Sequence, residues 1–73
     1  QDCNQEGIVV VRITVNRDGN VIDADPGVKG TTNMDSCLLQ PALKTALLHK
    51  WYPDENAPER QVGFVVINFK LGE

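Results

Sequence analysis

Few side chains in this sequence are of the types that perform catalysis, and their spacing does not favour it. The one histidine, His49, would need a cysteine beside it to act in a nucleophilic Cys–His pair. Cys37 lies about three turns away along an expected helix, roughly 18 Å at 1.5 Å per residue. We therefore expect His49 to be a partly exposed residue near the C-terminal end of that helix.

The carboxylates and cysteines are equally weak candidates for a site. Asp23 and Asp25 share one face of a short expected strand, a spacing that suits a general acid–base pair but suits two solvent-facing residues better. The turn sequence NRDGN at residues 16–20 lacks the ligand spacing of a calcium loop. Two cysteines are too few for a structural zinc site unless His49 and a carboxylate complete it. The sequence therefore predicts no enzyme activity, no metal and no cofactor.

Composition narrows the remaining classes of function. The 73 residues suit one small domain, which buries only roughly 60% of its unfolded surface. The net charge of −3, with Lys and Arg scattered along the chain, disfavours nucleic-acid binding. No apolar run approaches the roughly 20 residues that cross a bilayer. The only methionine is Met34, so we expect the chain to be a piece of a longer or processed protein.

Three strands are expected between short polar segments. A polar lead-in at residues 1–6 precedes a strand at residues 7–15, GIVVVRITV, and a shorter one at residues 20–25, NVIDAD. Asp18-Gly19 between them is a strong hairpin signal, because both residue types tolerate positive φ. The third strand lies within residues 60–71, RQVGFVVINFKL.

A helical region is expected before the third strand. Apolar residues recur at helical spacing between residues 38 and 51. Asp35 or Ser36 is placed to cap the helix. Pro41 predicts either a new helical start or a kink, because it removes one backbone hydrogen bond. We expect Pro53 to close the helical region.

This order of elements predicts an α+β fold of the type β-β-α-β. The first two strands form an antiparallel hairpin, and the helix carries the chain back to the same sheet. We expect the third strand to lie antiparallel beside the first, giving a three-stranded sheet in the order 2-1-3 with the helix on one face. The expected core consists of Val9, Val11, Ile13, Val65, Ile67, Phe69 and the leucines of the helix. The other face is expected to be bare at Ile8, Val10, Phe64 and Val66.

The third strand is then an unusual edge. Lys70 is the only charged residue in residues 62–71, whereas proteins usually protect such edges with charges or prolines. One interpretation is partner binding by strand addition, in which main-chain hydrogen bonds supply the affinity. The others are that further upstream residues cover the edge, or that the domain dimerises through it.

The sequence also resembles a known protein family. Residues 7–24, GIVVVRITVNRDGNVIDA, are similar to the opening of the TonB C-terminal domain family, which runs G-x-V-x-V-x-F/I-T-V-x-x-D-G-x-V-x-D. A helix at residues 38–48, the aromatic-x-Pro element WYP at residues 51–53 and the strand VVINFKL at residues 65–71 follow in the family's order. The resemblance covers residues 7–71.

Three features depart from the family pattern. His49 stands where many members have a tryptophan, and Pro41 stands where a small helix former is usual. The Tyr-Pro element that usually lies upstream of the first strand is not present in these residues.

The two cysteines also bear on the resemblance. From the residues alone, Cys3 and Cys37 suit a disulfide and two buried free thiols equally well. A subset of the family resembles this chain in its cysteine near the first strand, its DSCLL helix start and its APERQ loop. That resemblance, together with the oxidising periplasm that such domains occupy, implies a Cys3–Cys37 disulfide.

The resemblance implies a function in transport. TonB proteins are anchored in the inner membrane and span the periplasm, and their C-terminal domain binds the TonB box of outer-membrane receptors by strand addition. The domain passes on work from the proton motive force, which an inner-membrane proton-channel motor complex delivers through the N-terminal part of the protein. We accordingly expect residues 1–73 to be a periplasmic domain, with a membrane anchor and linker upstream.

The expected binding site is the edge of the third strand at residues 61–71. Its backbone is expected to supply most of the pairing, and the side chains at its start and near its end are placed to reach a docked peptide. The residues concerned are Arg60, Gln61, Val62, Gly63, Phe64, Val66, Asn68 and Lys70.

Other functions remain open at this point. TonB-like domains also occur fused to membrane peptidases or signalling proteins, and TolA-type domains share the topology but bind other envelope or phage proteins. A further alternative is a homodimer that buries the last strand and the bare face.

Overall fold

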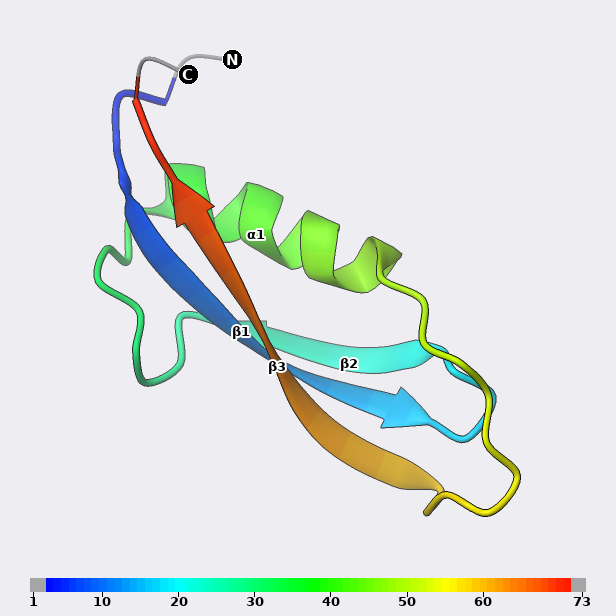
Figure 1. The fold of residues 1–73 in the computed structure, drawn as a ribbon. Helices are drawn as coiled ribbons and strands as arrows, with labels where there is room; N and C mark the ends of the chain where they lie inside the picture. The colour runs from blue at the N-terminus through cyan, green and yellow to red at the C-terminus, as the bar shows by residue number, and fades with distance from the viewer. Residues whose placement is uncertain (1–2, 72–73) are drawn as a thin grey trace.

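The computed structural model describes residues 3–71, so residues 1 and 2 of the expected lead-in lie outside the described part. Four elements follow one another in the predicted order (Figure 1). They are β1 (Gly7–Asn16), β2 (Val21–Pro26), α1 (Ser36–Leu48) and β3 (Arg60–Phe69). Both neighbours of β1 run antiparallel to it, in the order β2-β1-β3, and α1 lies on one face. The predicted α+β fold and the strand order 2-1-3 are therefore confirmed.

The β1–β2 turn forms where the Asp18-Gly19 signal predicted it. The Asn16 carboxamide oxygen accepts hydrogen bonds of 3.0 Å from the backbone N–H groups of Asp18 and Asn20, and the Asn16 carbonyl accepts one from Gly19. Gly19 has a φ of +88°, a backbone conformation that residues other than glycine rarely adopt. The turn therefore depends on local residue types, which is why the sequence predicted it.

Asp35 rather than Ser36 caps α1. Its carboxylate accepts a 2.9 Å hydrogen bond from the backbone N–H of Cys37, one of the N–H groups that a helix leaves free in its first turn. Pro41 lies inside the helix, which continues through it from Ser36 to Leu48. The predicted alternative of a new helical start at Pro41 is therefore wrong, and the helix continues although proline lacks the N–H for one backbone hydrogen bond.

The helix ends earlier than the apolar spacing predicted. His49 has a ψ of 137°, which is extended, so Trp51 and Pro53 lie outside the helix. The reason is tertiary, because the backbone N–H of Trp51 donates a 3.0 Å hydrogen bond to the carbonyl of Gly19 in the β1–β2 turn. The loop after α1 is thus held by the hairpin and does not continue the helix.

The core lies between α1 and the near face of the sheet. Val9, Val11 and Ile13 of β1 are fully buried there, as predicted. From the helix, however, the buried residues are Leu38, Ala42 and Ala46, whereas Leu47 and Leu48 are exposed. The expectation that all the helix leucines join the core is therefore wrong, because alanines occupy the positions at which α1 approaches the sheet.

The third strand is less covered by the helix than predicted. α1 packs mainly over β2 and β1 and touches β3 little. Val65, Ile67 and Phe69 are therefore only half-buried and line the margin of the core. This offset leaves both faces of β3 accessible along its outer side.

The far face of the sheet is not bare throughout, as the sequence had suggested. Val10 is only 8% exposed and Ile8 is half-buried, because the loop at residues 27–32 runs beside the first half of β1. The carbonyl of Val10 accepts hydrogen bonds from Gly27 and Val28, and its N–H donates to the Thr31 hydroxyl at 3.0 Å. Expecting Ile8 and Val10 to be bare was thus wrong, since a loop with no regular structure covers them.

A disulfide joins Cys3 to Cys37, with 5.8 Å between the two Cα atoms. It ties the segment before β1 to the first turn of α1. The pairing that the resemblance implied is therefore present in the structure.

Candidate functional site: an exposed strand edge

β3 forms one edge of the sheet, and among residues 3–71 no other strand lies on its outer side. Three large apolar residues on this strand are mostly exposed, Val62 at 62%, Phe64 at 60% and Val66 at 65%. Such an edge presents unpaired N–H and C=O groups, which is the arrangement that pairs with another chain.

The backbone groups that point outward can be identified from β1. Ile8 and Val10 direct their N–H and C=O groups toward the loop at residues 27–32, through hydrogen bonds to Thr32, Thr31 and Gly27. Adjacent residues of an antiparallel strand alternate in this direction. The residues of β1 with odd numbers therefore pair with β3.

The register then assigns the free groups on β3. Val9 lies opposite Ile67, Val11 opposite Val65 and Ile13 opposite Gly63, so these odd-numbered residues of β3 use their backbone groups on β1. The intervening residues direct theirs outward. They are Val62, Phe64, Val66 and Asn68, which we call the edge residues.

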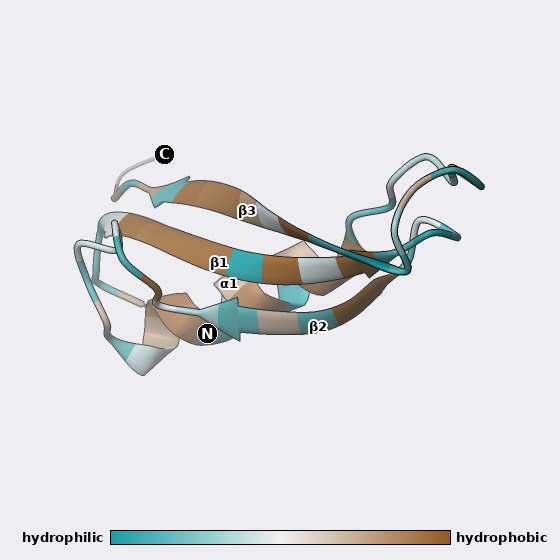
Figure 2. Cartoon of the chain, turned by 90° about the horizontal axis from the view of Figure 1, so that it is seen from below, coloured by the Kyte–Doolittle hydropathy of each residue, from teal (hydrophilic) through white to brown (hydrophobic). Residues whose placement is uncertain are grey.

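The side chains of the edge residues lie together on the far face of the sheet, away from α1. Figure 2 shows β3 as hydrophobic over most of its length, whereas β2 is strongly hydrophobic only at its start and then alternates between hydrophilic and weakly hydrophobic residues. All four residues thus present free backbone groups, and three of them, Val62, Phe64 and Val66, add an apolar strip. A strand added there would bury part of that strip while it satisfied the backbone groups.

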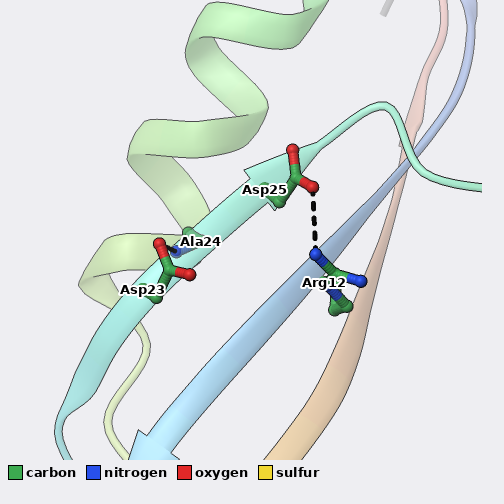
Figure 3. Close-up of polar contacts among 4 residues, drawn as sticks. All are labelled: Arg12, Asp23, Ala24 and Asp25. Carbon is green, nitrogen blue, oxygen red and sulfur yellow. Dashed lines mark hydrogen bonds and ion pairs between the residues drawn. The ribbon is translucent and has the colours of Figure 1, made fainter.

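On the far face, β1 and β2 carry charged side chains beside the apolar residues of β3. Arg12 of β1, which lies opposite Phe64, makes a 3.3 Å ion pair with Asp25 of β2 (Figure 3). Asp23 accepts a hydrogen bond from the backbone N–H of Ala24 and, like Asp25, is exposed. The two carboxylates are therefore the solvent-facing residues that the sequence predicted, and the surface changes from acidic to apolar between β2 and β3.

The predicted site residues lie along one edge. Arg60 is the first residue of β3, opposite Asn16, and Lys70 follows its last residue. All are exposed except Gly63, which is half-buried. The residues that the structure brings together are Arg60, Gln61, Val62, Gly63, Phe64, Val66, Asn68 and Lys70. Of these, Gln61 and Gly63 pair with β1 through their backbone groups, so of the two only Gln61 still offers a polar group, its side chain, to a partner.

The other groups with possible chemistry are not assembled. The ring Nδ1 of His49 lies 3.0 Å from the carbonyl oxygen of Thr45, and Cys37 is held in the disulfide, so the two do not form a Cys–His pair. Within residues 3–71, no three His, Cys, Asp or Glu side chains gather as metal ligands would. Over the same residues, no helix has the length and apolar character needed to span a membrane.

Sequence reasoning missed a cavity beside the start of β3. Its volume is about 240 Å³, and it is lined by residues of β1, β3 and the loop after α1. Trp51 and Tyr52 come from that loop and Gln61, Val62 and Gly63 from β3. The only sequence signal was the aromatic-x-Pro element at residues 51–53, and its spacing had suggested the end of a helix.

Comparison of the chain with protein-family models, with curated proteins and with solved structures found no match.

Proposed function

We propose that the domain binds an extended segment of a partner protein as a fourth strand beside β3. The observation that carries this proposal is the row of edge residues, whose backbone groups have no partner within residues 3–71 and of which Val62, Phe64 and Val66 form an apolar strip. Main-chain pairing supplies affinity with little dependence on sequence, and burial of the strip adds to it.

The resemblance to the TonB C-terminal domain family supports the identity of the partner. On that basis the segment is the TonB box of an outer-membrane receptor, and the domain is the periplasmic end of an inner-membrane-anchored energy transducer. Energy from the proton motive force reaches it through an N-terminal part and a motor complex. The disulfide is compatible with this location, because disulfides persist in the oxidising periplasm.

The geometry suits the transmission of force. Several backbone hydrogen bonds lie side by side between paired strands, so a pull parallel to the strands loads them together. In single-molecule pulling on the complex, we expect the bond lifetime under load along the strand to exceed the lifetime under load that peels the peptide away. Equal lifetimes in the two geometries would contradict this part of the proposal.

An NMR titration tests the binding proposal. The domain is titrated with a peptide copied from a receptor's TonB box, and the amide signals of Val62, Phe64, Val66 and Asn68 are followed. We expect these outward-facing N–H groups to shift and to become protected from hydrogen exchange. The buried amides of Val9 and Val11, which already pair with β3, serve as internal controls and change little.

A second candidate uses the same edge. Two copies of the domain could pair through β3 and bury Phe64 and Val66 against each other, since exposed apolar patches often mark interfaces. Light scattering over a dilution series distinguishes the two functions. A monomer whose edge amides respond to peptide supports receptor binding, whereas a dimer that no peptide displaces supports self-association.

A further inference from the structure

The cavity near the start of β3 is continuous with the exposed edge. Gln61, Val62 and Gly63 belong both to the strand and to the cavity lining. The rest of the lining comes from Val15 at the end of β1, from the β1–β2 turn and from the loop after α1, including Trp51 and Tyr52. A strand that pairs with the edge residues therefore passes beside the cavity at one end.

The loop that borders the cavity is held in place by backbone hydrogen bonds. The Trp51 N–H donates to the Gly19 carbonyl, and the Asp54 N–H donates to the Arg17 carbonyl, each at 3.0 Å. The Ala57 N–H in turn donates to the Asp54 carbonyl at 3.0 Å. Figure 1 shows this loop, in yellow, running past the β1–β2 turn. The cavity is thus formed before any ligand arrives.

Its size and lining indicate the kind of group that it holds. Sites for separate small molecules usually measure roughly 300–1,000 Å³, whereas this one measures about 240 Å³. Two aromatic residues, Trp51 and Tyr52, border it, and Tyr52 is 97% exposed, so a guest can cover surface that water now contacts. Aromatic rings pair favourably in offset or edge-to-face arrangements. A single aromatic side chain fits these properties.

Gly63 gives independent support. It is the only glycine in β3, and a glycine inside a strand weakens it and often marks a bulge, a bend or a place where a ligand or another backbone approaches closely. The protein itself does not require it there, because an added Cβ would lie 3.7 Å from Ile13 Cγ1, which is ordinary van der Waals contact. Gly63 also lines the cavity, which places this glycine where a guest would approach β3.

We infer that the cavity receives one aromatic side chain of the segment that pairs with β3, and that this contact sets the segment's register. The inference rests on the proposed strand addition. Val62, Phe64 and Val66 form a nearly uniform apolar strip, so a peptide shifted by two residues would keep similar backbone bonds and similar contacts. An aromatic residue that fits only at the cavity removes that ambiguity.

The test uses short capped peptides of alternating Thr and Val, each with a single Phe at a different position, and a parent peptide without Phe. Amide shifts at Phe64 and Val66 report strand pairing, and the fluorescence of Trp51, the only tryptophan, reports occupation of the cavity. We expect one Phe position to bind about tenfold more tightly than the parent and to change the Trp51 emission.

The outcomes separate the inference from the proposed function. If the edge amides shift but affinity and emission do not depend on the Phe position, the cavity inference is overturned and strand addition stands. If no peptide shifts the edge amides, strand addition fails and the inference fails with it. A Phe preference without a change in Trp51 emission would place the aromatic contact elsewhere and would also overturn the inference.

A variant of the cavity provides a second test. Ala57→Leu places a larger side chain in the lining without changing β3, and we expect the affinity ratio between the best Phe peptide and the parent to fall to about one. Thr45→Leu, at an exposed position on α1, adds a leucine away from the cavity and should retain the ratio. An unchanged ratio in Ala57→Leu would count against the cavity as the binding place.

Discussion

Trp51 and Gly19 are joined by a 3.0 Å hydrogen bond from the backbone N–H of Trp51 to the carbonyl oxygen of Gly19. This bond ties the loop after α1 to the β1–β2 turn. The approach is close enough that a Cβ on Gly19 would overlap the carbonyl oxygen of Trp51. One glycine therefore serves the turn, through its positive φ, and also the border of the cavity.

We expect Gly19→Ala to lower the free energy of unfolding by about 1–3 kcal/mol, because it combines a strained φ with a steric overlap. Urea unfolding followed by Trp51 fluorescence measures the change. Asp18→Ala, at the exposed neighbouring position of the same turn, is the control and should stay within about 0.5 kcal/mol of the wild type. Equal losses in both variants would argue against the Gly19–Trp51 contact as the cause.

Proline substitutions at two adjacent positions test which backbone groups face outward. Val66→Pro removes an outward N–H, so the domain should remain folded while a TonB box peptide binds about tenfold more weakly or worse. Val65→Pro removes an N–H that pairs with β1 and should cost about 3 kcal/mol or more of stability. Circular dichroism measures the stability of each variant, and the NMR titration measures its affinity for the peptide. If Val66→Pro unfolds the domain and Val65→Pro only weakens binding, the assignment of the edge is wrong.

The disulfide should supply much of the stability of so small a domain. Cys3 and Cys37 are separated by 34 residues, for which the chain-entropy model gives about 3–4 kcal/mol. The variant Cys3→Ser with Cys37→Ser should therefore unfold at a clearly lower urea concentration than the oxidised protein. Adding a reductant to the wild type should reproduce the shift and should have no effect on the double variant. A loss below about 1 kcal/mol would contradict this expectation.

The helix cap gives a prediction with a neighbouring control. Asp35→Ala removes the acceptor of the Cys37 N–H and should cost about 1 kcal/mol. Ser36→Ala, at the other position that the sequence offered as a cap, should cost less because Ser36 is inside the helix. Thermal unfolding of the two variants ranks them, and a larger loss for Ser36→Ala would reassign the cap.

The Arg12–Asp25 pair should contribute little to stability despite its geometry. The side chains are 52% and 54% exposed, and ion pairs in contact with water usually contribute about 0–1 kcal/mol. A double-mutant cycle with Arg12→Ala and Asp25→Ala measures the coupling, which should decrease further as salt is added. A coupling above about 1 kcal/mol that persisted in high salt would mean that the pair is less solvated than its exposure indicates.

Local patterns account for the parts of the fold that were predicted correctly. Three local patterns predicted these elements: the alternating apolar residues in β1, the Asp18-Gly19 turn and the helical spacing after Asp35. Each pattern extends over a few residues, so it can be recognised without knowledge of the rest of the chain. The same patterns identified β3 as an exposed edge, because too few charges protect it.

The errors share a different origin. Val10 is covered by a loop that has no periodicity to read, and Trp51 leaves the helical pattern because it is bonded to Gly19, far away in sequence. Leu47 and Leu48 have the residue type of a core but lie where α1 does not face the sheet. In each case the packing of distant segments, and not a local preference, decided the outcome.

Hydrophobic periodicity and turn chemistry are local properties, so the amino-acid sequence was enough to predict the elements, their order and the strand that is left at the edge. The tertiary structure alone decided which backbone groups of β3 point outward, how far α1 reaches over that strand, and that Gly63 lies beside Trp51 in one cavity. Those features depend on strand register and on packing between segments far apart in the chain, and no local pattern carries that information.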